Sequence, residues 1–131
     1  MASSNKLVRS VSLPPDPAWL PAARRSVREL VNGIGADARE RAEIIVTELL
    51  TNAIRHARLD PNDVIGVGLA LHDEYIRIEV ENPARGAPFS VPIVHGPGEG
   101  GLGLKIVAAL SRRCGVHLDG TTVVWAEVAT A

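Results

Sequence analysis

The chain has 131 residues, of which 46% are hydrophobic and 22% charged, and this size and composition predict one globular domain over residues 1–131. A formal net charge of −1 argues against charge-driven binding to nucleic acid or to a membrane surface. The lone cysteine excludes a disulfide framework and a multi-cysteine zinc site, and without a long apolar run or a signal-peptide pattern we expect a cytoplasmic protein.

The pattern of apolar and polar residues predicts the secondary structure in chain order. Alternation with a period of two indicates strands, and Asp16 followed by Pro17 is typical of a capped helix start. The predicted elements are a strand over 6–13, helices over 17–32 and 36–57, strands over 64–72 and 75–81, a helix over 102–114, and strands over 116–119 and 121–130.

Strands and helices are segregated along the chain rather than strictly alternating. This order predicts helices layered on one face of a mixed sheet. Residues 84–101 are rich in Gly and Pro and show no periodicity, which is typical of a lid or binding loop. Cys114, at the end of the last predicted helix, is expected to be a buried apolar filler rather than a nucleophile.

The second predicted helix carries the first candidate site, within the segment ELLTNAIRHA. Glu48 and Asn52 are four residues apart and share one face, which we expect to lie opposite the stripe of Ile45, Leu49 and Ala53. An amide oxygen can ligate Mg²⁺, and a carboxylate can accept the proton of an attacking hydroxyl. From spacing alone, a solvated helix face is the more frequent explanation.

The second candidate site is the glycine-rich run HGPGEGGLGLKIV, which leads into a helix and is suited to a phosphate. Gly98, Gly100 and Gly103 match the dinucleotide-binding spacing, but the βαβ context of such a site is missing. Lys105 is followed by Ile106 and not by Ser or Thr, so a Walker A loop is excluded. A flexible loop before a helix is the alternative.

The third candidate is the segment 81–88 (ENPARGAP), which follows a predicted strand. A polar side chain at the strand end can bond a ligand edge, and Gly86 permits contact with the backbone. Taken alone, an ordinary turn is the more frequent explanation. The three candidates together are more specific than any one of them.

In this order, the segments resemble the Bergerat-fold ATPases (gyrase, MutL and histidine kinases among them), and most closely the anti-sigma-factor serine kinases of the RsbW and SpoIIAB type. ELLTNAIRHA resembles the N box, segments 81–88 and 98–107 resemble the two glycine boxes, and 120–125 resembles the last glycine/threonine motif. The resemblance covers nearly the whole chain. It implies an α+β, two-layer sandwich with three helices on one face of a mixed, mostly antiparallel sheet, and an ATP lid over 84–101.

The resemblance also implies roles for individual residues. Glu48 matches the catalytic carboxylate, Asn52 the Mg²⁺ ligand, and Arg55 is assigned to phosphate. The positions implied in cofactor binding are Asn52, Arg55, Asn82, Gly86, Gly98, Gly100, Gly101, Leu102, Gly103, Leu104, Thr121 and Thr122.

One position departs from the family pattern: Asn82 stands where the family has an aspartate that accepts from the adenine amino group. The amide oxygen can still accept this bond, but a neutral bond has roughly half the strength of a charge-assisted one. A shift of the strand by one residue would offer Glu81 instead, and would turn the neighbouring side chains to the wrong faces. We therefore expect Asn82 to occupy the position.

The function implied is an ATP-binding anti-sigma factor with Mg²⁺-dependent serine/threonine kinase activity toward an anti-anti-sigma partner of the STAS type. The alternative is a catalytically weak or inactive module that sequesters a sigma factor or another regulator. A detached histidine-kinase ATP domain and a gyrase-like ATPase are weaker alternatives, since these residues hold neither a phosphoacceptor helix nor a transducer domain. Family members commonly form homodimers, so a homodimer is compatible with the resemblance.

Overall fold

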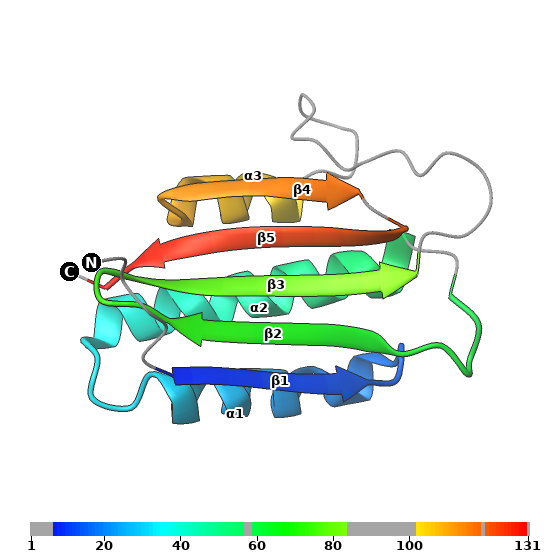
Figure 1. The fold of residues 1–131 in the computed structure, drawn as a ribbon, viewed down its shortest axis with the longest axis horizontal. Coiled ribbons are helices and arrows are strands. Elements are labelled where there is room, and N and C mark those ends of the chain that lie inside the picture. Colours follow the sequence, from blue (N-terminus) through cyan, green and yellow to red (C-terminus); the bar gives the residue numbers. More distant parts are fainter. Residues whose placement is uncertain (1–6, 57–58, 84–101, 119, 131) are drawn as a thin grey trace.

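The computed structural model of the chain describes residues 7–56, 59–83, 102–118 and 120–130 (Figure 1). The elements are β1 (Leu7–Leu13), a 3-10 helix η1 (Pro17–Trp19), α1 (Leu20–Leu30), α2 (Ala36–His56), β2 (Ile65–Leu71), β3 (Tyr75–Pro83), α3 (Leu102–Leu110), β4 (Arg113–Leu118) and β5 (Thr121–Ala129). The predicted cap is confirmed, because the side chain of Asp16 accepts from the Ala18 backbone N–H at 2.9 Å. The predicted lid, 84–101, lies outside the described residues.

The five strands form one sheet in the order β1-β2-β3-β5-β4. Every neighbouring pair among these strands is antiparallel, so the sheet is not mixed as predicted. Figure 1 shows the reason, since β3 and β4 point the same way but β5 lies between them. β5 is therefore the antiparallel neighbour of both β3 and β4.

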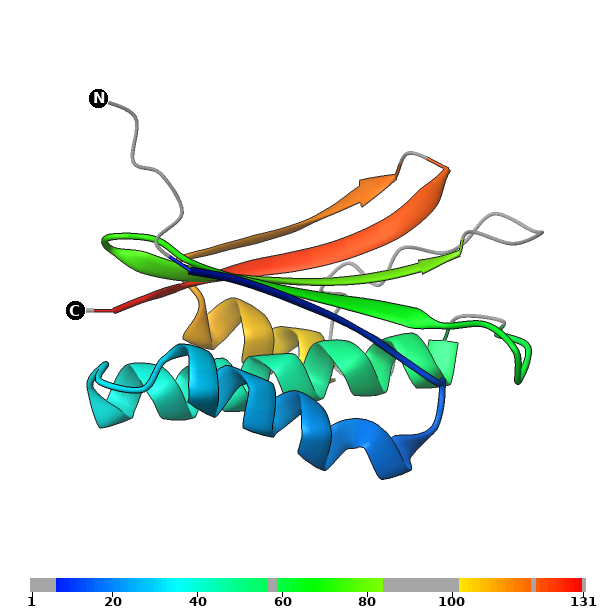
Figure 2. The same cartoon turned by 60° about the horizontal axis from the view of Figure 1, so that its bottom comes forward.

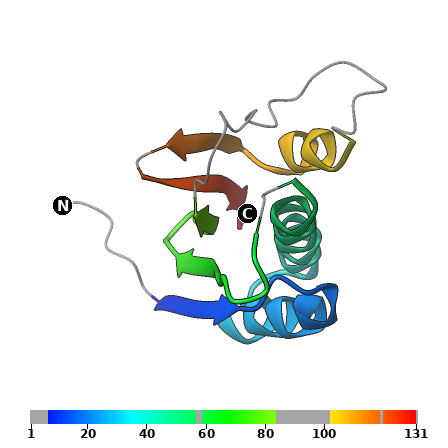
Figure 3. The same ribbon diagram turned by 90° about the vertical axis from the view of Figure 1, so that its right-hand side faces the viewer.

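The helices and the sheet form two layers, as the resemblance implies. Figures 2 and 3 show α1, α2 and α3 on one face of the sheet, with the other face free of helices. α2 is the central helix of its layer, because it packs against α1, α3 and the middle strands β3 and β5. This position makes α2 the element that connects the helical layer to the centre of the sheet.

The apolar core lies between the two layers. Alternate residues of β3 are buried toward the helices, and the same holds for β5, as expected for a sheet covered on one face. The largest fully buried side chains are Val27, Val31, Ile45, Val46, Leu49, Leu50, Ile65, Val67, Leu69, Ile76, Ile78 and Val80. The core cluster takes six buried residues from α2, and these include the predicted stripe of Ile45, Leu49 and Ala53: Ala42, Ile45, Val46, Leu49, Leu50 and Ala53.

The last predicted helix is shorter than expected. α3 ends at Leu110, and the backbone N–H of Arg112 donates to the Glu127 carbonyl at 2.8 Å, which joins the chain to β5. Pairing of β4 with β5 therefore takes residues 113 and 114 out of the predicted helix. Cys114 lies on edge strand β4 and is exposed, so the prediction that it fills the core is wrong.

The helix-free face of the sheet has its own layer of aromatic and charged side chains. The Arg77 guanidinium lies 4.2 Å from the centre of the Trp125 ring and donates to Glu127 at 3.1 Å. The Trp125 ring in turn lies against Gly115 of the neighbouring strand, where a Cβ atom would approach Cζ2 at 2.9 Å. Gly115 is therefore required for the placement of this ring.

Gly115→Ala is expected to destabilise the protein by about 1–3 kcal/mol, because the added methyl group displaces the Trp125 ring. Gly68→Ala is the matched control, since a Cβ atom at this strand position meets its nearest neighbour at an ordinary 3.9 Å. Urea unfolding of both variants measures the difference. Equal stabilities for the two variants would contradict the packing described.

Candidate functional site

Three chain segments meet at one end of the two layers. Figure 1 shows that α2 and β3 run in the same direction and end at this edge, whereas β5 begins there; α3 begins farther along the helical layer, away from the edge. The last residues of β3 pair with the first residues of β5, from Glu81 opposite Val123 to Pro83 opposite Thr121. The end of the N-box segment, the end of β3 and the last glycine/threonine motif are thus brought to one edge, and α3 packs beside α2.

Asn82 and Thr122 form a buried polar pair at this edge. They are directly opposite each other on β3 and β5, on the side of the sheet that faces the helices, and are 3% and 0% exposed. The Asn82 Nδ2 atom donates to the Pro83 carbonyl at 3.3 Å. The Thr122 hydroxyl oxygen is buried and has no hydrogen-bond partner in the part of the chain described.

A buried hydroxyl without a partner is unfavourable by about 1–3 kcal/mol, and native proteins keep few such groups. The Thr122 hydroxyl is therefore a position where a ligand or a bound water completes the structure. The amide of Asn82 beside it offers both a donor and an acceptor. The pair can recognise a small polar edge, such as that of a heterocyclic base.

Thr121 and Glu81 lie on the opposite face of the sheet. The Thr121 hydroxyl donates to Glu81 Oε2 at 2.7 Å, and the Glu81 side chain is exposed. The structure thus brings Thr122 to Asn82 and places Thr121 on the other face, so of the two predicted threonines only Thr122 lies beside Asn82. It also excludes Glu81 as the substitute for Asn82, since neighbouring strand residues point to opposite faces.

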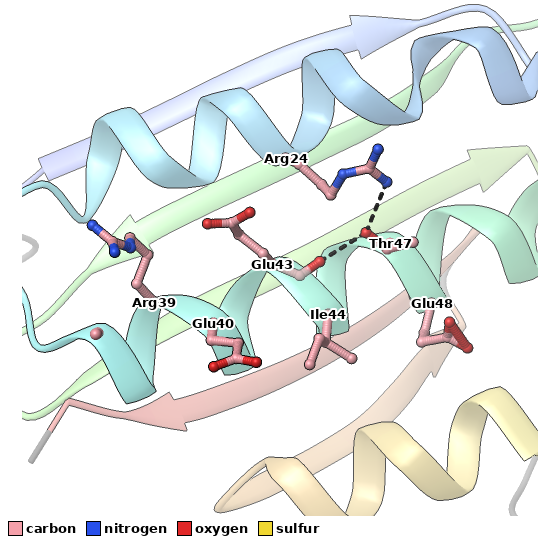
Figure 4. Close-up of a pocket in the computed structure, with 8 residues that line it drawn as sticks. Arg24, Arg39, Glu40, Glu43, Ile44, Thr47 and Glu48 are labelled. Atoms are coloured by element: carbon pink, nitrogen blue, oxygen red, sulfur yellow. Dashed lines mark hydrogen bonds between the residues drawn. The ribbon is translucent and has the colours of Figure 1, made fainter.

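Glu48 and Asn52 lie in the second half of α2, one turn apart, and both are half-buried. They flank the buried stripe of Ile45 and Leu49 and do not lie opposite it as predicted, because each follows a stripe residue by three positions, which is only about 60° around a helix. Figure 4 shows the Glu48 side chain on the side of α2 that faces α3. Glu48 forms no ion pair within the described ranges.

The other predicted residues divide into three groups. Arg55 is exposed in the last turn of α2, and Leu104 is 7% exposed with its side chain in the core. Leu102 and Gly103 open α3, whose free N–H groups and positive dipole end favour an anion. The predicted glycines Gly86, Gly98, Gly100 and Gly101 lie outside the described residues.

The side-chain oxygens available at this site suit a metal ion that is held mainly by the phosphate groups of a bound nucleotide. Residues 7–56, 59–83, 102–118 and 120–130 contain no cluster of three His, Cys, Asp or Glu side chains suited to a metal ion. Asn52 offers one amide oxygen beside the Glu48 carboxylate, and Mg²⁺ commonly takes one or two protein oxygens together with phosphate oxygens.

Among the helices in the described ranges, none is long and apolar enough to cross a membrane.

Sequence reasoning missed a hollow of about 500 Å³ over the outer side of α2 (Figure 4). Its lining residues are Arg24, Ala36, Arg39, Glu40, Glu43, Ile44, Thr47 and Glu48. All but Arg24 belong to α2, and Arg24 comes from α1. The hollow depends on how α1 packs beside α2, for which the sequence pattern carries no signal.

Comparison with solved structures shows the same fold in larger proteins. The chain superposes on the RsbU and RsbW domains of Rv1364c from Mycobacterium tuberculosis with a TM-score of 0.71 and 17% identity, over 95% of this chain and 33% of that one. It superposes on the histidine kinase domain of a blue-light activated histidine kinase from Erythrobacter litoralis with a TM-score of 0.54 and 22% identity, over 99% of this chain and 64% of that one. The chain thus spans about a third of the first of these proteins.

No curated protein sequence matches the chain at a significant level. The family of histidine kinase-like ATPase domains, in contrast, matches residues 13–127, which include every element from α1 to β4 and most of β5. The fold, the order of the motifs and this match agree. The chain belongs to the family of histidine kinase-like ATPase domains.

Proposed function

We propose that the chain is an ATP-binding regulator that transfers the γ-phosphate of MgATP to a serine or threonine hydroxyl of a partner protein. The observation that carries the proposal is the buried pair of Asn82 and Thr122, whose hydroxyl has no described partner. The pair lies at the edge where α2 also ends (Figure 1), and α3 packs beside α2. A nucleotide suits this place because it joins a polar base edge to a chain of phosphates.

The base end of the proposed site is formed by the two sheet residues. One N–H of the Asn82 Nδ2 atom donates to the Pro83 carbonyl, which orients the amide, and we take its Oδ1 atom as the acceptor for an exocyclic amino group such as that of adenine. The Thr122 hydroxyl then bonds a ring nitrogen directly or through a water. This pattern favours adenine over a base with a carbonyl at the same position.

The phosphate end is formed by the two helices. The N-terminus of α3 at Leu102 and Gly103 supplies backbone donors, and Asn52 supplies an oxygen to Mg²⁺. When bound, Mg²⁺ neutralises charge that develops on the phosphate oxygens. Glu48 accepts the proton of the partner's hydroxyl while that oxygen forms a bond to the γ-phosphorus and the bond to the β–γ bridging oxygen breaks.

A protein partner is part of the proposal. The likeness to a protein that contains an RsbW domain supports a regulatory role, and we propose a sigma factor, an anti-anti-sigma protein of the STAS type, or both as partners. The second candidate function is a binding module that sequesters such a partner without transfer. Asn82, an amide where the family has a carboxylate, favours this second candidate because it weakens the contact with the base.

Thr122→Val is expected to weaken ATP binding about 5- to 100-fold, because the valine removes the hydroxyl that the base edge uses but keeps the shape of the side chain. Thr121→Val is the matched control on the same strand, and its ATP affinity is expected to be unchanged because Thr121 faces the other side of the sheet. Calorimetric titration of both variants with MgATP measures the effect. Equal affinities in the two variants would contradict the proposed base site.

A further inference from the structure

The hollow over α2 has walls of opposite charge. Figure 4 shows Arg24, Arg39 and Glu43 on the side of α1, and Glu40, Ile44 and Glu48 on the other side of the helix. Glu43 is engaged by Arg28, at 3.6 Å between Oε1 and Nε. One wall is therefore left with two arginines that form no ion pair among the described residues, and the other with two such carboxylates.

These four charges do not satisfy one another. Arg24 donates to the Thr47 hydroxyl at 3.4 Å, which is a long bond to a neutral group. Arg39, Glu40 and Glu48 form no ion pair in the part of the chain that the structure describes. Opposite charges that face one hollow without pairing are suited to a ligand that carries both signs.

The hollow adjoins the proposed site at Glu48, which lines the hollow and is the proposed proton acceptor. We propose that it receives the segment of the partner protein that carries the acceptor hydroxyl, and that its charges select this segment. The inference rests on the proposed function and adds to it a specificity for the partner's sequence. The occupant is an extended peptide segment, since the hollow follows α2 rather than forming a deep cavity (Figure 4).

The spacing along α2 translates into a sequence preference. Glu40, Ile44 and Glu48 are successive i, i+4 positions, so they lie about 6 Å apart along the helix axis, and an extended segment covers about 3.3 Å per residue. With the hydroxyl at Glu48, the second residue from it reaches Ile44 and the third or fourth reaches Glu40. An apolar residue fits at the second place, against Ile44, and a basic residue fits at the third or fourth, against Glu40.

The other wall adds an acidic preference next to the hydroxyl. Arg24 contacts Thr47 on the α1 side of the hollow, across from Glu48. Successive side chains of an extended segment point to opposite sides, so the residue next to the hydroxyl points toward Arg24. Ile44 is 36% exposed and forms an apolar patch between the charged ends. The preferred segment therefore has an acidic residue adjacent to the serine or threonine, an apolar residue at the second place, and Lys or Arg at the third or fourth.

The test uses serine peptides that vary at the residue next to the serine and at the second to fourth residues from it. They are incubated with the full chain and labelled MgATP. Each correct charge is expected to raise kcat/KM about two- to fivefold, the size typical of partly exposed ion pairs. Arg24→Glu is expected to reverse the preference beside the serine from Asp to Lys, and Glu40→Lys to reverse the preference at the third or fourth place. Arg25→Glu is the control, because Arg25 is exposed on α1 and does not line the hollow.

The outcomes separate this inference from the function on which it rests. MgATP affinity is measured for each variant and is expected to stay unchanged, which also shows that the variants are folded. Absence of MgATP binding in the unmodified chain would contradict the proposed function. Transfer without charge preference, an unchanged preference in Arg24→Glu, or transfer to the cognate partner but to no peptide would contradict the role of the hollow alone. MgATP binding without transfer to either would contradict the proposed transfer.

Discussion

Glu48→Gln is expected to lower the rate of phosphoryl transfer by about 10²- to 10⁴-fold, because the amide cannot accept the proton of the acceptor hydroxyl. The MgATP affinity is expected to change little, since Glu48 is half-buried on α2 and the substitution leaves Asn82 and Thr122, the residues proposed to bind the base, untouched. Glutamine has nearly the same size and shape as the glutamate that it replaces. The effect should therefore appear in kcat and not in binding.

The control for this variant is Glu29→Gln, which removes a carboxylate from the exposed part of α1. Glu29 pairs with Arg9 at 2.8 Å, and both side chains are about half-exposed, so its loss costs little. Single-turnover transfer of labelled phosphate to the cognate partner measures both variants. Equal transfer by Glu48→Gln and Glu29→Gln would remove Glu48 from catalysis and favour the sequestering alternative.

Ile45→Ala is expected to destabilise the fold by about 2–5 kcal/mol, the range for removal of a fully buried aliphatic side chain. Ile45 is 0% exposed and lies in the part of α2 that faces the sheet, so its loss leaves a cavity between the two layers. This is a large share of the stability of a domain of ordinary size.

The neighbouring residue gives a matched control for this prediction. Ile44 is 36% exposed on the same helix, and Ile44→Ala is expected to change the free energy of unfolding by less than about 1 kcal/mol. The change in helix propensity is the same in both variants, so the difference between them measures burial alone. Similar unfolding curves in urea would contradict the orientation of α2.

The class of the fold was predictable because it rests on local patterns. The alternation in β2 and β3 and the apolar stripe of α2 follow directly from the burial of one face of each element. The predicted strands and helices are confirmed, with changes at their ends. Family resemblance then implied the two-layer arrangement that Figures 2 and 3 show.

Features that depend on contacts between distant segments were predicted less well. The insertion of β5 between β3 and β4 removed the mixed pairing, and its bonds to residues 113–118 shortened α3 and exposed Cys114. Spacing along a single element does not contain this information. Tertiary pairing here overrides the local helical pattern.

The candidate site likewise combines features that local spacing predicts with features that depend on the pairing of distant segments. The shared face of Glu48 and Asn52 could be predicted from their spacing, whereas the pairing of Asn82 with Thr122 required the register of β3 and β5. The same register shows that Thr121 faces away from the site. Sequence reasoning named two adjacent threonines, and a strand can present only one of them to the helices.

Calorimetric titration with MgATP of the unmodified chain and of Asn82→Asp tests the central claim most directly. The account predicts that the unmodified chain binds MgATP with micromolar affinity, and that Asn82→Asp binds more tightly because a carboxylate accepts a stronger hydrogen bond from the base. Absence of binding by the unmodified chain, with recovery in Asn82→Asp, would contradict the claim. It would mean that the pocket keeps its shape but no longer holds a nucleotide, and that the protein acts by sequestration.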